Sequence, residues 1–344
     1  MDQSSDPPGF AGAIALPWIE RQLGPLQRPV EVVQLTGGRS NLTYRVTGAE
    51  GTTCVLRRPP MGTVLPTAHD MQREHRILAA LGGTGFPVPR VHGYRPPSDE
   101  TAEFYVMDYV GGHILEHVDD AAALTVAARR TAGESLVDAL IDLHRIEPET
   151  VGLGDLGRRT GYVERQLRRW SRQWELTKTE EVPEMAAVHG WLAEHVPPEG
   201  EGAIVHGDVR FGNAVFSDDG QLSALLDWEL CTLGDPLADV GYLLLTWDEP
   251  GDDVAVRPDG PTRLPGFPGR REALERYASR SGRDVSRIDY YITLQAWRLA
   301  CINQGVYSRY LSGDSGMAST DIEAIKRSVD RLVDVAVRGL SPSD

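Results

Sequence analysis

Hydrophobic positions along the chain are patterned differently before and after residue 111. Between residues 31 and 58, β-branched and aromatic residues gather in the short runs EVVQL, LTYRV and TTCVLR, which the turn-forming stretches TGGRSN and GAEGT separate. Because such runs bounded by turn signals are typical of strands, this part is predicted to form an antiparallel meander. The later runs PVPRVHGY and EFYVMDYV predict a fourth and a fifth strand.

One helix is predicted among these strands, over residues 69–81. An apolar stripe follows helical spacing there and comprises Met71, His75, Leu78 and Ala79. The glycine pair at 82–83 supplies a stop signal. Residues 1–110 are therefore predicted to form one lobe, a five-stranded sheet with one helix.

After the glycine pair at 111–112, longer helical patterns replace these strand-like runs. They cover residues 121–146, 161–176, 184–195, 268–280, 285–309 and 318–338. A strand-rich island at 203–229 interrupts them, with a Ser-Asp-Asp-Gly turn between two short strands. Asp235 and Pro236 then form a typical cap pair before a further apolar helix. We therefore predict an α+β fold in which residues 111–344 form a second, mainly helical lobe.

Composition and charge narrow the class of protein. Hydrophobic residues make up 41% of the chain and charged residues 25%, which is typical of a globular protein. The net charge of −15 argues against nucleic-acid binding, which needs a basic surface. No apolar run reaches the roughly 18 residues that cross a bilayer, and the apolar stretch at 11–19 lacks the basic flank of a signal peptide. Three cysteines are too few for a disulfide framework, which favours a cytoplasmic location. Together with the charge and the short apolar runs, this predicts a soluble protein without a nucleic-acid or membrane partner.

The island at 203–229 carries the strongest chemical signal. Asp208 is followed five residues later by Asn213, and Asp227 ends the apolar strand after the hairpin. Phosphoryl transfer needs one carboxylate to accept the proton of the attacking hydroxyl, and an amide oxygen and a second carboxylate to hold Mg²⁺. Asp208 would be the base, with Asn213 and Asp227 as metal ligands. The alternative is that these residues only make turns, through bonds to their own backbone.

The motifs HGDVRFGN and LLDWE resemble the catalytic loop and the metal-binding segment of the aminoglycoside phosphotransferase branch of the protein-kinase-like superfamily. The resemblance extends over nearly the whole chain. It implies a bilobal kinase-like fold that binds ATP and Mg²⁺. In that arrangement His206 packs behind the loop instead of acting as a base, and Asp239 braces the loop from a helix.

The N-terminal half contains candidates for a nucleotide site. The turn between the first two strands lies where a kinase covers the ATP phosphates, and its candidate residues are Gly37, Gly38, Ser40 and Asn41. Taken alone, a glycine pair there is equally typical of a plain hairpin. Strand alternation places Val55 and Arg57 on one face, as in the third strand of kinases, and Arg58 on the other, toward solvent. Because this lobe contains no lysine, Arg57 is the candidate for the phosphate-binding cation.

Two further nucleotide-site predictions rest on the same resemblance. Glu74 corresponds to the helix glutamate that pairs with the third-strand cation, although an exposed helix glutamate is the alternative. The segment Met107, Asp108, Tyr109 and Val110 falls where backbone groups of a kinase contact adenine.

The acceptor is less well defined. Residues 173–260 contain 19 Asp and Glu against three basic residues, a local balance of −16 that would attract a polycation such as an aminoglycoside. On the predicted helix 161–174, a second stripe beside the apolar one contains Arg165, Arg168, Arg169 and Arg172. These arginines suit a phosphate-bearing acceptor such as coenzyme A. For both features the alternative is an ordinary solvated surface.

Together with VLRRPP and RQLRRWSRQW, the catalytic loop resembles the phosphotransferase-like domains fused to some acyl-CoA dehydrogenases, which implies a hydroxyacyl-CoA acceptor. We therefore predict an ATP- and Mg²⁺-dependent transfer to the hydroxyl of a small molecule. A nucleotide-binding scaffold without turnover is the alternative, because the third-strand lysine is absent.

Overall fold

The structure is a computed structural model that describes residues 6–35, 41–61, 70–312 and 322–340. The chain divides into two compact units, and each is described by itself. The first unit contains residues 1–112 and 223–229, and the second contains 113–222 and 230–344. The predicted second lobe covers all of 111–344, but the segment 223–229 belongs to the first unit. One of its contacts there is the hydrogen bond from Leu225 N to Pro87 O at 2.8 Å.

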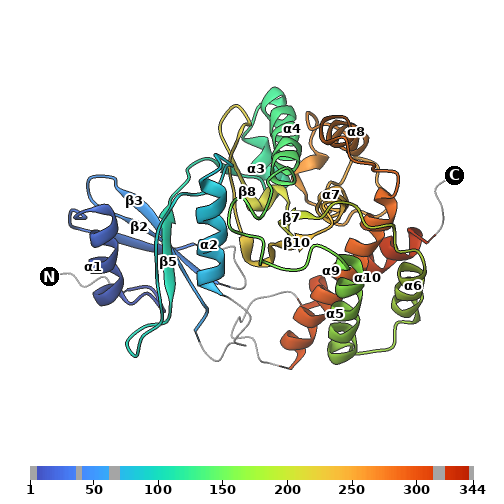
Figure 1. The fold of residues 1–344 in the computed structure, drawn as a ribbon, viewed down its shortest axis with the longest axis horizontal. Coiled ribbons are helices and arrows are strands. Elements are labelled where there is room, and N and C mark those ends of the chain that lie inside the picture. Colours follow the sequence, from blue (N-terminus) through green and yellow to red (C-terminus); the bar gives the residue numbers. More distant parts are fainter. Residues whose placement is uncertain (1–5, 36–40, 62–69, 313–321, 341–344) are drawn as a thin grey trace. The chain divides into compact units, whose positions relative to one another are not determined.

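Five strands of the first unit form one antiparallel sheet in the order β1-β2-β3-β5-β4 (Figure 1). Their bounds are β1 (Glu31–Gln34), β2 (Leu42–Thr47), β3 (Thr53–Arg58), β4 (Val91–Arg95) and β5 (Phe104–Asp108). Leu56 in β3 lies opposite Tyr44 and Val106, and all three are buried. The predicted five-stranded antiparallel arrangement is therefore present.

Two helices accompany this sheet. Helix α2 (Met71–Gly82) begins at Asp70, whose carboxylate accepts a hydrogen bond from Arg73 N at 2.9 Å. Helix α1 (Gly12–Leu23) was not predicted, because its short apolar run contains Pro17. Trp18 of α1 packs edge-on against Phe104, and α1 thereby closes the core on one face of the sheet.

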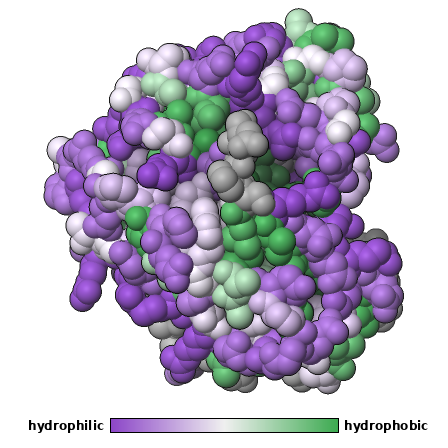
Figure 2. Space-filling model, turned by 90° about the vertical axis from the view of Figure 1, so that its right-hand side faces the viewer, coloured by the Kyte–Doolittle hydropathy of each residue, from purple (hydrophilic) through white to green (hydrophobic). Residues whose placement is uncertain are grey.

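The second unit is mainly helical. Its helices are α3 (Val118–Ala122), α4 (Val126–Leu143), α5 (Tyr162–Thr177), α6 (Pro183–Glu194), α7 (Leu237–Leu245), α8 (Arg270–Ser281), α9 (Ile288–Leu311) and α10 (Ile322–Arg338). Helix α9 contacts α5, α7 and α10. Every residue of α7 is buried, so α7 and α9 form the centre of this unit. Seen from the side on which α6 and α8 lie in Figure 1, the surface is mainly hydrophilic, with a hydrophobic patch near the centre (Figure 2).

Short strands hold the loops of the second unit in place. The pairs are β7 (Ala203–Val205) with β10 (Thr232–Gly234), and β6 (His113–Ile114) with β8 (Ala214–Phe216), both antiparallel. Strand β9 (Leu222–Leu225) belongs to the first unit from residue 223 onward. The catalytic-loop motif lies between β7 and β8, so both of its ends are fixed by strands. Within the described residues, no helix combines the length and apolarity that crossing a bilayer requires.

Candidate functional site

Arg57 lies among three carboxylates in the first unit. Its Nε is 3.1 Å from Glu74 Oε2, and its terminal nitrogen is 2.6 Å from Asp227 Oδ1 and 3.7 Å from Glu229 Oε2. The side chain is 12% exposed. The predicted pair between the third-strand arginine and the helix glutamate is therefore present. The structure adds Glu229, which the sequence reasoning did not single out, although it ends the motif LLDWE.

Glu74 is buried among hydrogen-bond donors. It is 2% exposed, which rules out the exposed helix glutamate considered as the alternative. The Tyr105 hydroxyl donates to Glu74 Oε2 at 3.0 Å, and Asn41 Nδ2 donates to Oε1 at 3.1 Å. Burial raises the pKa of Glu74 to about 7. The carboxylates of Asp227 and Glu229 act in the same direction, and Arg57 acts against it.

Asp227 has an unusual backbone conformation. Its φ is +65°, the only positive φ of a non-glycine residue in the described part of the chain. Residues held in this region are strained and cluster at functional sites. The conformation is fixed by the neighbouring Trp228, which is buried, packs on Phe86 and donates to Leu225 O at 3.0 Å. The carboxylate of Asp227 thus stays partly exposed beside Arg57.

The predicted adenine-binding segment divides at the end of β5. Met107 and Asp108 lie within the sheet, and Asp108 N donates to Arg90 O at 2.8 Å. The Asp108 amide is therefore used within the first unit, whereas Tyr109 and Val110 follow the strand and are the better placed of the four candidates for adenine contacts. Val55 is buried and pairs with Met107. Of the predicted phosphate turn, only Asn41 is described. Its other members, Gly37, Gly38 and Ser40, lie outside the described residues.

Arg58 does not face solvent as predicted. Its guanidinium donates to Gly9 O, and the residue is half-buried. Strand alternation does turn Arg58 to the face opposite Arg57, as expected. That face is covered by the segment that leads into α1, and Arg58 therefore anchors this segment to the sheet.

In the second unit, Asp208 is held by two donors. Asn213 Nδ2 lies 2.7 Å from Asp208 Oδ2, and the Tyr242 hydroxyl donates to Oδ1. Arg210 Nε is 3.9 Å from the same carboxylate. Burial, and then Asp208, raise the pKa of Tyr242, so Tyr242 remains a protonated donor. The carboxylate is fixed in orientation but stays partly exposed, as a residue that meets a substrate must.

Asp239 braces the loop that precedes Asp208. Its two carboxylate oxygens accept from His206 N at 2.7 Å and from Gly207 N at 2.8 Å. Burial alone would raise the pKa of Asp239, but hydrogen bonds and the nearby His144 hold it below the usual range. His206 is fully buried, and its Nδ1 accepts from Asp208 N at 3.2 Å. These contacts fit the structural role expected of His206 and the bracing role expected of Asp239.

The two predicted metal ligands offer oxygen donors, as Mg²⁺ requires. The Asn213 amide nitrogen is bound to Asp208, which leaves the amide oxygen to ligate a cation. Asp227 offers a carboxylate in the first unit. Within the described residues, no group of three His, Cys, Asp or Glu side chains is arranged to hold a metal ion. Each residue by itself offers the kind of oxygen ligand that Mg²⁺ takes, and Mg²⁺ commonly binds one or two carboxylates and completes its shell with water and substrate phosphates.

Helix α5 carries the four predicted acceptor arginines, but not all of them are available. Arg165 donates to the backbone oxygens of Thr160 and Arg158, so its guanidinium is used within the chain. This weakens the case for Arg165 as an acceptor residue, which stays a prediction. Arg168, Arg169 and Arg172 are exposed. The apolar stripe of this helix consists of Val163, Leu167, Trp170 and Trp174, and of these Trp170 is only half-buried while the others are buried.

Sequence reasoning missed two residues beside Asp208. Tyr242 lies three positions after Asp239 in α7, so helical spacing from the bracing aspartate could have found it. Arg210 lies inside the catalytic-loop motif, and Glu116 binds both Arg210 and Arg257. Glu116 precedes α3 and no local pattern singles it out. These contacts join three separate segments of the second unit around the catalytic loop.

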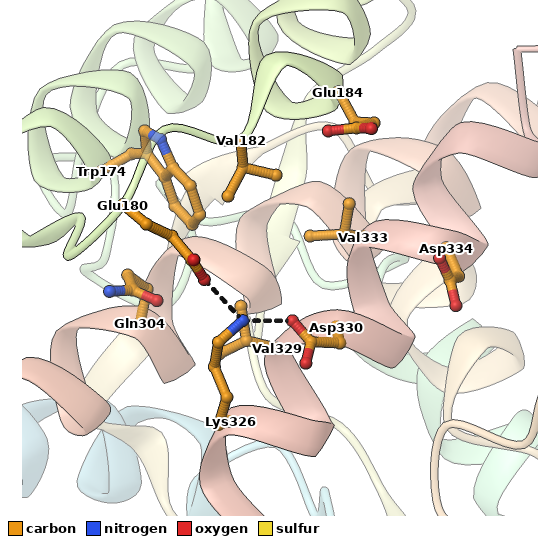
Figure 3. A pocket seen from close by; sticks show the side chains of 10 residues that line it. All are labelled: Trp174, Glu180, Val182, Glu184, Gln304, Lys326, Val329, Asp330, Val333 and Asp334. Atoms are coloured by element: carbon orange, nitrogen blue, oxygen red, sulfur yellow. Dashed lines mark hydrogen bonds and ion pairs between the residues drawn. The ribbon is translucent and has the colours of Figure 1, made fainter.

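A separate pocket of about 290 Å³ lies among α5, α6, α9 and α10 (Figure 3). Trp174 and Val182 belong to its apolar lining. Lys326 pairs there with Glu180 at 2.8 Å and with Asp330 at 2.6 Å. The pocket contains none of the predicted site residues.

Comparison with known proteins identifies the class. A family model described as "Phosphotransferase enzyme family" matches residues 31–281. This match covers well over half of the chain, and the chain therefore belongs to this phosphotransferase family. This match confirms the predicted family membership. Similarity to solved structures confirms the kinase-like α+β fold.

Three individual proteins are similar to the chain. "Acyl-CoA dehydrogenase family member 10" of Mus musculus is 33% identical over 297 residues, which cover 85% of this chain and 28% of that protein. A crystal structure of a Ralstonia eutropha protein proposed to be an aminoglycoside phosphotransferase is 27% identical, with a TM-score of 0.77 and coverage of 95% of this chain and 97% of that one. An amicoumacin kinase in complex with AMP-PNP, Ca²⁺ and its ligand shares the fold, with a TM-score of 0.64, 15% identity, and coverage of 97% and 96%. The chain thus spans less than a third of the length of the first relative.

Proposed function

We propose that this protein transfers the γ-phosphoryl group of ATP to a hydroxyl group of a small molecule. The observation that carries the proposal is the fixed and partly exposed carboxylate of Asp208, oriented by Asn213 and Tyr242. Membership of a phosphotransferase family supports the reaction type. The nucleoside triphosphate and the divalent cation in the amicoumacin kinase complex are in keeping with ATP and Mg²⁺ as partners here.

Asp208 acts as the base in the proposed reaction. Its carboxylate accepts the proton of the acceptor hydroxyl while that oxygen bonds to the γ-phosphorus. The bond from this phosphorus to the bridging oxygen breaks, and ADP leaves with the electron pair. Tyr242 and Asn213 keep the carboxylate pointing at the hydroxyl. Positioning of this kind accounts for much of catalysis in phosphoryl transfer.

Arg57 has the task that a lysine performs in many kinases. Its guanidinium is fixed by Glu74 and lies within reach of Asp227. We propose that it binds the phosphates of ATP and that Tyr109 and Val110 contact adenine. Asn213 and Asp227 would hold Mg²⁺, which when bound neutralises charge on the phosphates.

Two acceptor classes follow from different observations. The similarity to an acyl-CoA dehydrogenase family member and the arginines on α5 favour a hydroxyacyl-CoA-like acceptor. The acidic segment and the similarity to a proposed aminoglycoside phosphotransferase favour a cationic acceptor. A nucleotide-binding scaffold is the second candidate function, because Arg57 replaces the usual lysine and is already paired with carboxylates.

An acceptor panel tests the proposal. Aminoglycosides, choline, sugars and hydroxyacyl-CoA compounds are incubated with ATP and Mg²⁺, and ADP and the phosphorylated product are both quantified. We expect Mg²⁺-dependent product from at least one class. ATP binding without product and without background hydrolysis would support the scaffold instead. Measuring product separates true transfer from hydrolysis, which ADP alone does not.

A further inference from the structure

Arg298 in α9 is a buried cation whose hydrogen-bond partners are neutral. It is 4% exposed. Its terminal nitrogens donate to Gln295 Oε1 at 2.8 Å and to Gly207 O at 3.0 Å, and its buried Nε has no hydrogen-bond partner. Within the described residues, Arg298 forms no ion pair. A buried guanidinium of this kind is costly unless an anion accompanies it.

A second guanidinium lies close to the first. The Arg169 guanidinium carbon is 4.8 Å from the centre of the Trp170 ring, and that of Arg298 is 5.7 Å from the same ring. Arg169 is exposed and makes no hydrogen bond or ion pair with any described residue. Partial loss of water around the guanidinium, and then the positive charge of Arg298, lower the pKa of Arg169. Two like charges therefore lie beside one indole ring, and neither forms an ion pair with a described residue.

Three other arginines of the second unit that lie near carboxylates are paired with them. Arg210 and Arg257 share Glu116, and Arg276 forms two bonds to Asp138. Carboxylates do lie near Arg298, since Asp239 accepts from Gly207 N while Arg298 donates to Gly207 O. Within the described residues, however, none of them forms an ion pair with Arg169 or Arg298, so both guanidinium groups can still attract an anion.

The arginine pair lies beside the catalytic loop. Arg298 binds the carbonyl oxygen of Gly207, the residue before Asp208. The Arg298 guanidinium carbon also lies 5.8 Å from the ring centre of Tyr242, whose hydroxyl donates to Asp208. An anionic group bound at the pair would thus be part of a molecule within reach of the base.

We propose that Arg169 and Arg298, with the Trp170 ring, form a subsite for an oxyanion group of the acceptor. Arg169 offers the accessible donors, and Arg298 adds positive charge from beneath. The acceptor is therefore a hydroxyl compound that carries a carboxylate or a phosphate. This inference rests on the proposed phosphotransferase function and names its acceptor class.

Matched pairs of small hydroxyl compounds test the subsite by calorimetry. The carboxylate pair is 3-hydroxybutyrate and its neutral amide, and the phosphate pair is glycerol 3-phosphate and glycerol. The protein is first saturated with Mg²⁺ and AMP-PNP so that phosphate cannot enter the nucleotide site. We expect the charged member of at least one pair to bind about tenfold more tightly, because charge-assisted bonds to arginine are strong. The pair that shows the preference identifies the oxyanion.

Arg169→Gln should abolish that preference and leave the binding of neutral compounds unchanged. Arg271→Gln is the matched control, since Arg271 is a highly exposed arginine on α8, and it should keep the preference. Equal binding of charged and neutral members, or a preference that survives in Arg169→Gln, would overturn the proposal. Arg298→Lys, which keeps the charge, should retain the preference.

Transfer to the same compounds is measured in parallel. An Arg169-dependent preference without phosphorylated product from any acceptor would contradict the proposed function and leave the oxyanion subsite supported. Phosphorylated product whose rate of formation does not depend on the charge of the acceptor, and does not change in Arg169→Gln, would support the phosphotransferase function and refute the oxyanion subsite.

Discussion

One guanidinium faces three carboxylates in the first unit, and this imbalance defines the chemistry of Arg57. Glu74, Asp227 and Glu229 all lie within 3.7 Å of its nitrogens. Full ionisation of all three would leave two uncompensated negative charges, so this site favours added cations or protons. Mg²⁺ can supply that charge when nucleotide binds, and the Arg57 guanidinium can then turn to phosphate oxygens.

Substitutions at neighbouring positions of β3 distinguish the role of Arg57 from that of Arg58. Arg57→Ala should weaken ATP binding by about tenfold or more, because a charge-assisted contact to phosphate is lost. Arg58→Ala should leave ATP affinity nearly unchanged but lower stability by about 1–3 kcal/mol, because the Gly9 carbonyl loses its charged donor. Calorimetry with Mg²⁺-ATP and chemical denaturation measure the two effects. Similar losses of ATP affinity in both variants would show that Arg57 has no special role in binding the ATP phosphates.

The raised pKa of Glu74 predicts a pH-dependent stability. Because its pKa is about 7 in the folded protein against 4.5 as a reference, the folded state holds the proton more tightly. This contribution is complete below pH 4.5 and is lost as the pH rises to about 7. It amounts to at most about 3 kcal/mol. Denaturation curves of wild type and Glu74→Gln should therefore converge or cross over this range, whereas a constant difference would contradict the assignment.

At the scale of elements, periodicity located most helices, but it did not identify every buried face. In α2, Met71 and Leu78 are buried as predicted, while Ala79 is exposed and Glu74 is buried. Hydrophobic spacing assigns charged residues to solvent, and only the Arg57 cation in another strand explains why Glu74 lies inside. The resemblance to kinases, and not the periodicity, predicted that pair.

The catalytic-loop motif was readable from local sequence because its spacing reflects short-range contacts. Asn213 binds both the carboxylate and the backbone oxygen of Asp208, five residues earlier. Tyr242, Glu116 and Arg298 reach the same loop from distant parts of the chain. Long-range contacts of this kind depend on how helices pack, and no local pattern encodes them.

The loop geometry requires glycine at position 207. Gly207 has a φ of +86°, and a Cβ there would lie 2.9 Å from Leu230 O. Gly207→Ala should lower kcat by about 10²-fold through displacement of Asp208, with little change in ATP affinity. Gly251→Ala is the control, since Gly251 also has a positive φ of +97° but faces open space. Its kcat should equal that of the wild type, and equal loss in both variants would contradict a positional effect.

At the scale of the whole molecule, the candidate residues come from both compact units. Arg57, Glu74 and Asp227 belong to the first unit, and Asp208 and Asn213 belong to the second. The first unit acquires Asp227 from a segment that follows the catalytic loop in the sequence, which explains why a simple division at residue 111 was incomplete. The predicted location in the cytoplasm stays a prediction.

The central claim is that Asp208 takes the proton of the acceptor hydroxyl while other residues bind Mg²⁺-ATP. The most direct test measures phosphoryl transfer to the best acceptor of the panel and Mg²⁺-ATP affinity in parallel for the wild type, Asp208→Asn and Asp227→Asn. Asp208→Asn should lower kcat by about 10²–10⁴-fold with ATP affinity unchanged, because the shape is kept and the base is lost. Asp227→Asn should instead lose the Mg²⁺-dependent part of ATP binding. Wild-type turnover in Asp208→Asn would contradict the account.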